Sequence, residues 1–407
     1  MSQVAAIEAL VKRRHPAAPP TSTGTLARAG RLIFNPGSIC VGAAAILSIV
    51  GIAAISTTEP GLAVRQGLFL IIGMIAAAVV ALPHYVWLRR FSYPLLGFTV
   101  LLLIFVMIPF VPEGLVRPRN GARRWINLGL TDFQPSEVAK IAFVLALANW
   151  LRLKKNYRRL TGLLVPFILT FIPMGLVLIE PDLGSALLFL PTLFAMLIAA
   201  GAKLRHIALI IVLGVSAAPA MYPLLRDHQK DRIDAMVAQI TGDTRHADDI
   251  GYQGSRAQTL VAAGGLKGVG GAHARDLVVY NHLPEEHNDM IFAVVSARWG
   301  LAGGLLAMLT YLLFMAGGLV TAAFCRDAFG RLIVVGVVAV IFAQMTINIG
   351  MTIGLMPITG MTLPFVSYGG SSLVATWMMA GLILNVALRR PRYLEREPFA
   401  FDDEEDA

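Results

Sequence analysis

Asp289 is the residue of this sequence best suited to act as a catalytic group. It is the last acid of the polar segment that begins at Leu283, and an apolar run from Met290 to Ala297 follows at once. A carboxylate at the edge of an apolar segment gains proton affinity by desolvation, which suits a general base. His287 and Asp289 alone make a weak metal pair, because zinc sites take three or four protein ligands. The pattern therefore predicts a general base at Asp289.

A second charged pair opens the apolar stretch 135–152, where the sequence from Gln134 reads Gln-Pro-Ser-Glu-Val-Ala-Lys. Proline and an acid are ordinary in a first helical turn, which accounts for Glu137. Lys140 has no such explanation. Three residues apart, Glu137 and Lys140 share a helix face and can pair, and ionisable residues inside a membrane usually mark a site. We expect Gln134, Glu137 and Lys140 to bind substrate; the alternative is a purely structural ion pair.

Four arginines fall in the loop 112–134, namely Arg117, Arg119, Arg123 and Arg124. Arginine binds phosphate through its planar fork of donors. The cluster therefore predicts an anionic substrate group, such as a phosphate, at Arg123 and Arg124. The alternative is contact with anionic lipid headgroups.

Two turn-forming segments are weaker candidates. Residues 180–185, Glu-Pro-Asp-Leu-Gly-Ser, form the whole turn between two apolar stretches; proline and glycine favour a turn in any hairpin, so Asp182 is only a candidate binding residue. Residues 264–271 are glycine-rich but lack the Gly-Lys-Ser/Thr ending of a nucleotide loop. Close approach to a substrate and a flexible turn both fit them.

The segment 363–372 reads Leu-Pro-Phe-Val-Ser-Tyr-Gly-Gly-Ser-Ser and precedes the last apolar stretch. Its hydroxyls and the backbone amides of a helix start suit an anion. We expect substrate contacts at Ser367, Gly369 and Gly370. The alternative is a re-entrant loop that protein buries for structural reasons.

The composition is that of a membrane protein. Of 407 residues, 56% are hydrophobic and 14% charged, with a mean hydropathy of +0.69, whereas roughly a quarter of a soluble domain is charged. The net charge of +9 does not indicate nucleic acid, because the basic residues are scattered between apolar stretches. Residues 1–34 are expected to form a disordered cytoplasmic tail rather than a secretory signal. Cys40 and Cys325 are too few for a disulfide framework.

Ten stretches are predicted to be transmembrane helices, which makes the fold class an all-α polytopic membrane protein. They are 38–56, 65–83, 93–111, 135–152, 161–179, 184–201, 206–223, 300–324, 331–353 and 371–388. A long outer loop, 224–290, separates the seventh and eighth spans. The apolar stretch 290–297 is too short to span and is expected to enter from outside as a partial helix.

The distribution of basic residues predicts cytoplasmic termini. Every short loop on the side of the termini carries at least two Lys or Arg, whereas the turns 57–64, 180–183 and 354–370 carry none. The candidate residues above therefore lie toward the outer face. Residues 391–407 are expected to be a solvated acidic cytoplasmic tail.

Taken together, these motifs resemble the SEDS family, the bacterial RodA and FtsW proteins that polymerise peptidoglycan. The resemblance covers most of residues 35–390, and its segments 348–351 and 363–372 are more similar to the elongation protein RodA than to the division protein FtsW. Its most specific segments are 120–126 (Asn-Gly-Ala-Arg-Arg-Trp-Ile), 133–140, 181–184, 283–294 and 348–372.

The resemblance implies ten transmembrane helices in the bacterial inner membrane and an extracytoplasmic active site that joins disaccharide units from lipid II. It implies that Asp289 is the catalytic acidic residue. It places five further residues in or around the substrate cavity: Arg124, Trp125, Glu137, Lys140 and Asp182. It also implies a partner, a class B penicillin-binding protein transpeptidase.

Three departures from the family pattern affect the outer loop. The usual Ile-Gly-Ser-Gly-Gly is shortened to Ala-Gly-Gly at 263–265, an Asp-Pro near Arg232 is missing, and the usual Ala-Glu-Glu reads Ser-Ala-Arg at 296–298. Because Arg298 reverses a charge, any network around it must have been rebuilt.

Residues and resemblance together predict an inverting glycosyl transfer. Asp289 would accept the proton of the acceptor sugar 4-hydroxyl, while the arginines and Lys140 stabilise the departing pyrophosphate. A divalent cation, Mg²⁺ or Mn²⁺, could assist, although the sequence shows no cage for one. The alternatives are a flippase or transporter of lipid-linked precursors, a division-type FtsW-like polymerase, and a scaffold that only recruits a partner. Transporters with inverted repeats show paired broken helices, which the sequence lacks.

Overall fold

A computed structural model describes residues 35–119, 122–129, 132–153, 159–224, 230–231, 233–234, 237 and 252–389. The predicted tails 1–34 and 391–407 and most of the predicted outer loop between 225 and 251 lie outside the described residues. The chain from Pro36 onward falls within one compact unit.

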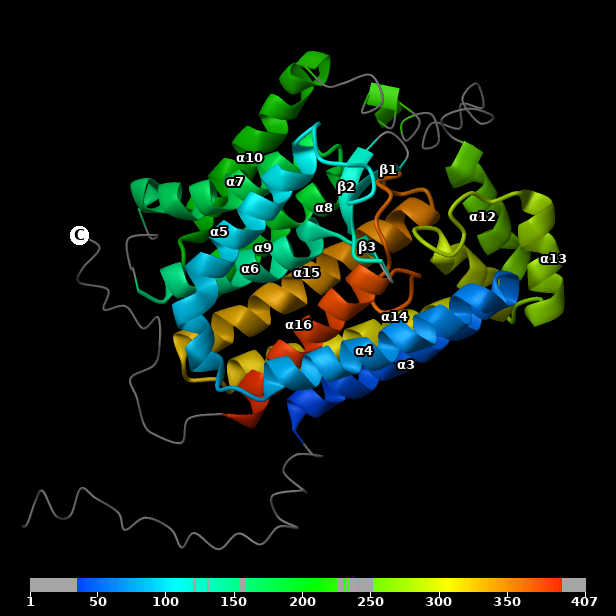
Figure 1. Ribbon diagram of the computed structural model, residues 1–407, viewed down its shortest axis with the longest axis horizontal. Coiled ribbons are helices and arrows are strands. Elements are labelled where there is room, and N and C mark those ends of the chain that lie inside the picture. Colours follow the sequence, from blue (N-terminus) through cyan, green and yellow to red (C-terminus); the bar gives the residue numbers. More distant parts are fainter. Residues whose placement is uncertain are drawn as a thin grey trace, which may run out of the picture. The chain divides into compact units, whose positions relative to one another are not determined.

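Helices dominate the described chain, and a helix lies over each of the ten predicted stretches (Figure 1). The corresponding helices are α3 (Pro36–Thr58), α4 (Pro60–Ala81), α5 (Leu88–Met107), α6 (Pro135–Leu151), α7 (Leu164–Ile179), α8 (Leu183–Leu187) with α9 (Phe189–Ala199), α10 (Leu204–Met221), α14 (Ile291–Ala323), α15 (Ala328–Thr352) and α16 (Gly370–Leu388). Two more, α12 (Tyr252–Gly264) and α13 (Gly271–Asn281), lie in the predicted outer loop.

Seven helical segments of the described chain are long and apolar enough to cross a membrane. Helix α6 has only 17 residues, and the sixth predicted span is split into α8 and α9. The chain is therefore an integral membrane protein of mostly helical fold, while the number of ten spans stays a prediction.

The all-α prediction is wrong for the loop between α5 and α6, which forms a small antiparallel sheet. Its strands are β1 (Val116–Arg119), β2 (Ala122–Asn127) and β3 (Asp132–Phe133), in the order β1-β2-β3. Val116 pairs with Ile126, and both pack on Val106 near the end of α5. The sheet therefore buries its apolar residues against α5. Other side chains of β2 do not take part in this packing.

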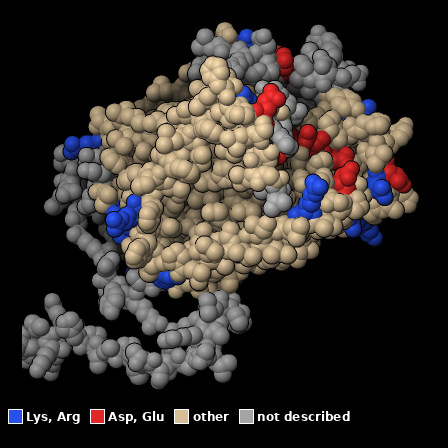
Figure 2. Space-filling model, viewed as in Figure 1, with Lys and Arg blue, Asp and Glu red and all other residues tan. Residues whose placement is uncertain are grey.

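Helix α15 is the most enclosed of the seven long helices. In the most apolar stretch of α15, 78% of the residues are buried inside the protein, compared with 22% in that of α4. Helices α3 and α4 lie side by side along one edge, next to α14 and α16 (Figure 1). Large apolar side chains such as Ile49, Leu68 and Leu101 remain exposed on α3, α4 and α5, and Figure 2 shows a broad face with few charged side chains. Such a surface is typical of contact with lipid.

Helix α14 is broken at Gly300, where the backbone takes a φ of +67°. The break separates a short helix at 291–299, buried over 291–297, from the long segment that follows. The predicted partial helix is therefore present, and the side of the membrane from which it enters stays a prediction. A broken helix leaves backbone amides and carbonyls without partners, which is costly inside a membrane protein.

The glycine-rich residues 264–270 supply those partners. The amide of Leu301 donates to the carbonyl of Gly265 at 2.8 Å, and the amide of Val269 donates to the carbonyl of Ala297 at 3.0 Å. A Cβ on Gly268, whose φ is +79°, would lie 2.3 Å from the carbonyl oxygen of Arg298. The glycines therefore permit close backbone approach, as one of the two interpretations predicted, but the partner is α14 rather than a substrate.

Candidate functional site

A polar cavity of about 680 Å³ lies at the N-terminal ends of α4, α6 and α16, beside the small sheet and the segment 283–290. This volume is in the range of small-molecule sites. Nine of the predicted site residues line it: Arg124, Trp125, Gln134, Glu137, Lys140, Asp182, Asp289, Gly369 and Gly370. Residues from segments that are far apart in the sequence therefore line one cavity, and most of the predicted site residues are among them.

Two predicted substrate-binding residues, Arg123 and Ser367, are not among the residues that line the cavity. The guanidinium of Arg123 donates to the carbonyl oxygens of Pro109 and Val111, at 2.9 and 2.6 Å. The hydroxyl of Ser367 accepts from the amide of Leu363 at 2.7 Å. Both side chains are used to hold a loop in place. The side chains of Arg117 and Arg119 lie outside the described residues.

Glu137 and Lys140 form a buried ion pair at the first turns of α6. The Lys140 ammonium lies 3.0 Å from Oε1 and 2.9 Å from Oε2 of Glu137. Glu137 is 4% exposed and Lys140 2%. A charged pair with so little exposure costs desolvation energy, so its presence at a cavity wall fits a functional site better than a stabilising contact.

Asp289 lies at the cavity wall in the turn that precedes α14, and only 7% of its surface is exposed. Its backbone carbonyl accepts a hydrogen bond at 2.7 Å from the side-chain amide of Asn348 on α15. The same amide donates to the carbonyl of Met361 at 2.6 Å. On Gly360, a Cβ would lie 3.8 Å from Oδ2 of Asp289. Asn348 therefore ties the turn that carries Asp289 to the loop between α15 and α16.

Arg124 joins the sheet to the turn between α7 and α8. Its guanidinium donates to the carbonyl of Glu180 at 2.7 Å and to the carbonyl of Pro181. Asp182 caps α8 by accepting from the amide of Ser185 at 3.1 Å, and its other oxygen accepts from the side-chain amide of Gln134 at 3.1 Å. The predicted residues of this wall thus form one connected network.

Glu180 lies behind that wall with 3% of its surface exposed. Neither of its carboxylate oxygens makes a hydrogen bond with the described residues. Burial raises the pKa of Glu180 to about 8; the charge of Asp182 adds to the rise and that of Arg124 opposes it. Sequence reasoning treated Glu180 only as part of a turn.

The raised pKa of Glu180 predicts a pH-dependent stability. Between pH 4.5 and 8 the unfolded chain ionises at this position while the folded chain stays protonated, so folding stability should fall as the pH rises through this window. The variant Glu180→Gln has no carboxyl to ionise. It should therefore be more stable than the parent at pH 8 by on the order of 2–4 kcal/mol, and nearly equal to it at pH 4.5.

Thermal unfolding of the detergent-solubilised protein at the two pH values measures this difference. Glu113→Gln is the matched control, because Glu113 is exposed in the loop after α5; it should keep the pH dependence of the parent. A Glu180→Gln variant that melts with the parent at pH 8 would contradict the raised pKa.

The loop before α16 is held by Gln66 of α4. The Gln66 side chain donates to the carbonyl of Ser367 at 2.8 Å and accepts from the amide of Gly369 at 3.3 Å. The amide of Tyr368 donates to the carbonyl of His287 at 2.8 Å. These contacts place the N-terminus of α16 at the cavity, where its first amides favour a negative charge.

Sequence reasoning missed several residues that line the cavity: Arg65, Gln253, Glu285, Asn288, Gln344, Thr359 and Thr362. Ser371 and Ser372, whose hydroxyls belong to the segment expected to suit an anion, line it as well. Arg65 carried a usable signal, because it opened a predicted membrane span and charged residues there mark sites. The uncharged residues that were missed carried none. Over the described lining there are five acids and three bases, and no group of three or more His, Cys, Asp or Glu in the described chain is arranged to hold a metal ion.

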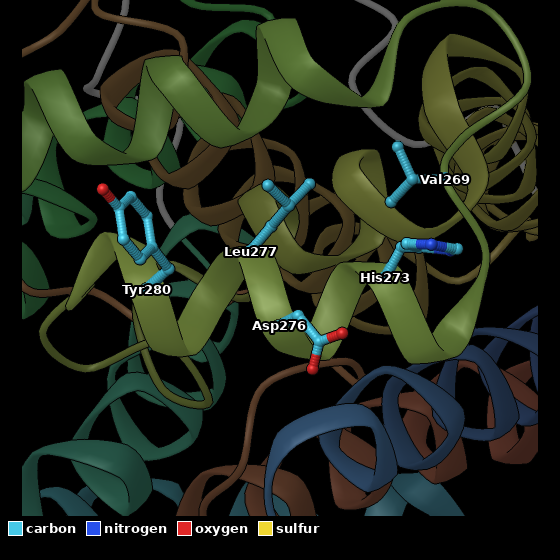
Figure 3. A pocket seen from close by; sticks show the side chains of 5 residues that line it. All are labelled: Val269, His273, Asp276, Leu277 and Tyr280. Atoms are coloured by element: carbon cyan, nitrogen blue, oxygen red, sulfur yellow. The ribbon is translucent and has the colours of Figure 1, made fainter.

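A second hollow, of about 520 Å³, lies on α13. Figure 3 shows His273, Asp276, Leu277 and Tyr280 along this helix, with Val269 contributed by the glycine-rich loop. None of the predicted site residues lines it. The polar cavity is therefore the candidate active site.

Fold and site define the class: an integral membrane protein in which a bundle of apolar helices encloses a charged cavity. A family model described as "Cell cycle protein", for FtsW, RodA and SpoVE, matches residues 31–391. The chain belongs to this family, which confirms the resemblance to the SEDS proteins.

Curated relatives carry related names. The chain is 35% identical over 331 residues to "Stage V sporulation protein E" of Bacillus subtilis, covering 81% of this chain and 87% of the relative. It is 34% identical to "Probable peptidoglycan glycosyltransferase FtsW" of Geobacter metallireducens, covering 80% and 84%. It is also 34% identical to "Peptidoglycan glycosyltransferase MrdB" of Escherichia coli, covering 67% and 72%.

Solved structures agree with the fold. A chain from the structure described as "Structural coordination of polymerization and crosslinking by a peptidoglycan synthase complex" matches with a TM-score of 0.74 at 29% identity, covering 87% of this chain and 98% of that chain. The rod shape determining protein RodA of Thermus thermophilus matches with a TM-score of 0.64 at 28% identity, covering 87% and 97%.

Proposed function

We propose that this protein is a peptidoglycan glycosyltransferase that polymerises lipid II into glycan strands. Relatives that match over most of their length carry the name of this activity. The observation that carries the proposal is the buried carboxylate of Asp289 at the wall of a cavity that also holds the Glu137–Lys140 pair. A base, a cation and a helix N-terminus around one cavity suit the transfer of a sugar from a diphosphate carrier.

Asp289 is the general base of the proposed reaction. It accepts the proton of the acceptor sugar 4-hydroxyl as that oxygen attacks the anomeric carbon of the donor. The bond from the anomeric carbon to the diphosphate breaks, and the diphosphate leaves with the electron pair on the face opposite the attack. Lys140, Arg124, Arg65 and the amides at the start of α16 stabilise the negative charge that grows there.

The finer topology is part of the proposal. Ten helices span the bacterial inner membrane, both termini are cytoplasmic, and the cavity opens on the extracytoplasmic side, with the long loop between the seventh and eighth spans. The distribution of Lys and Arg in the short loops supports this orientation. The catalytic domain comprises residues 35–390.

The partner is proposed to be a class B penicillin-binding protein transpeptidase. A structural relative belongs to a complex described as coordinating polymerization and crosslinking, which supports such a partner. An elongation role rests on the RodA-like segments 348–351 and 363–372. Overall identity does not decide this point, because relatives named SpoVE, FtsW and MrdB match at 35, 34 and 34%.

A divalent cation, Mg²⁺ or Mn²⁺, is proposed to enter with the substrate. Acids outnumber bases five to three over the described lining, which opposes the binding of a diphosphate. A cation held by the diphosphate and one or two carboxylates would offset this charge, and Mg²⁺ binds in that way in phosphate sites. The described side chains do not form a complete metal cage, so the ion is not expected to stay bound without substrate.

Removal of divalent cations should therefore suppress polymerisation at least tenfold, and added Mg²⁺ or Mn²⁺ should restore it. Polymer formed by the purified protein in the presence and absence of EDTA measures the effect. Added NaCl at matched ionic strength serves as the control. Full activity after exhaustive chelation would contradict the cation proposal and leave the polymerase proposal intact.

Purified protein and fluorescent lipid II test the proposed function itself. The protein, with and without its partner, should convert lipid II into long glycan strands that separate on a gel. A flippase would instead move lipid II across a vesicle bilayer without forming polymer, and a scaffold would do neither. Absence of polymer under all conditions, with the partner present, would overturn the proposal.

A further inference from the structure

Arg298, where this chain departs from the family pattern, contacts the last turns of α3. Its guanidinium donates to the hydroxyl of Thr57 at 2.8 Å and to the carbonyl of Ala53. It also lies over the ring of Trp299, 4.6 Å from the centroid. The C-terminal end of a helix carries partial negative charge, which favours a cation. Arg298 thus makes polar contacts across the fold, 241 residues from Thr57.

The other flank of the Asp289 segment reaches the same end of α3. Glu286 is half-buried, and its carboxylate lies near the hydroxyl of Thr58, which opposes the rise in the pKa of Glu286 that burial causes. Glu286 precedes Asp289 by three residues, and Arg298 follows it by nine. The end of α3 is therefore near both flanks of the segment that carries the catalytic carboxylate, and it is hydrogen-bonded to the Arg298 flank.

The short helix at 291–299 links Arg298 to Asp289 as a stiff unit. Residues 291–297 are all buried, and seven helical steps place Arg298 roughly 10 Å from Ile291. Gly300, with its positive φ, marks the break beyond Arg298 and separates this unit from the rest of α14. A rotation of the short helix at the break would displace Asp289, because the turn that carries it adjoins the other end.

We propose that Arg298 is a positioning residue that fixes the Asp289 carboxylate in the cavity by docking its segment on the end of α3. The inference rests on the proposed function, since it assigns Asp289 the role of base. Arg298 acts through the backbone of the short helix rather than by touching substrate. A single nitrogen of its guanidinium, Nη1, donates to both the carbonyl of Ala53 and the hydroxyl of Thr57, whereas an acid at this position would face the carbonyl of Ala53.

Steady-state polymerisation by the purified full-length chain tests the inference. Displacement of a catalytic group by about 1 Å can cost up to a hundredfold in rate, so Arg298→Gln should lower kcat by about tenfold or more. Its KM for lipid II should stay within about twofold. Arg298→Lys should recover part of the loss. Thr57→Val should lower kcat less, and the two changes combined should add little beyond Arg298→Gln alone.

Arg275→Gln is the matched control, because Arg275 is exposed on α13; it should behave as the parent. Hydrogen–deuterium exchange of the segment 283–299 should rise in Arg298→Gln while the melting temperature of the protein stays near that of the parent.

An active parent whose Arg298→Gln and Thr57→Val variants keep the parent kcat would overturn the inference. So would a loss of activity that follows a fall in melting temperature and is not relieved by Arg298→Lys. A parent that forms no polymer would instead overturn the proposed function, and the exchange experiment would still report whether Arg298 holds the segment.

Discussion

Asp289→Asn is expected to abolish polymerisation of lipid II while the protein keeps its fold. Asparagine has nearly the same size, and the hydrogen bond at this position that Asn348 donates goes to the backbone carbonyl, so the turn should be preserved. The amide cannot accept the proton of the acceptor hydroxyl. Loss of a general base costs about a hundredfold to ten-thousandfold in rate, so polymer should fall below detection on a gel.

Asp276→Asn provides the control for this experiment. Asp276 is an exposed acid on α13, away from the polar cavity, and its replacement removes the same charge without touching the site. It should polymerise lipid II as the parent does. Equal melting temperatures of both variants and the parent would show that the fold is intact, and undiminished polymer from Asp289→Asn would end its assignment as the base.

Variants of the buried Glu137–Lys140 pair should change the stability and the activity of the protein to different extents. Lys140→Met leaves the Glu137 carboxylate buried without its cation, and breaking a buried pair in this way costs about 3–5 kcal/mol. The double variant Glu137→Gln/Lys140→Met removes both charges and should regain most of that stability. It should still lose activity by about a hundredfold, because the cation that stabilises the departing diphosphate is absent.

Thermal unfolding and polymerisation of the three proteins measure these two effects side by side. The intact Arg89–Asp327 pair, at 2.6 Å and about a quarter exposed, offers a comparison: neutralising both of its members should leave polymerisation unchanged. A double variant at 137 and 140 that is both stable and fully active would make the pair structural, which was the alternative considered from the sequence.

The sequence predicted the site residues that are ionisable and lie in or beside apolar stretches. Asp289, Glu137 and Lys140 stood out because ionisable residues are rare in apolar stretches, and all three line the cavity. Arg123 shows the limit of this reasoning. Arg123 and Arg124 are neighbours in a strand, yet only Arg124 reaches the cavity, because the guanidinium of Arg123 is bonded to the carbonyls of Pro109 and Val111. The strand itself was not predicted, and so neither was this division.

Residues whose role depends on distant partners could not be assigned in advance. Asn348 stood in a motif with no stated purpose, and its amide proves to hold the carbonyl of Asp289, 59 residues away. Gln66 holds a loop 301 residues later. Neutral amides are common in loops and helices, so nothing in their local sequence distinguishes these two from others.

The sequence by itself determined the membrane-embedded helices, because a lipid-facing helix must be apolar along its whole length and this demand is local. It also determined where the short helix before Gly300 lies, and that the Asp289 carboxylate precedes it. The tertiary structure alone decided that residues 264–270 close the break at Gly300, and that Arg298 docks on α3. Such contacts depend on which backbone groups lack a hydrogen-bond partner at the break and on which segments pack against them. The spacing of residues along the chain predicts neither.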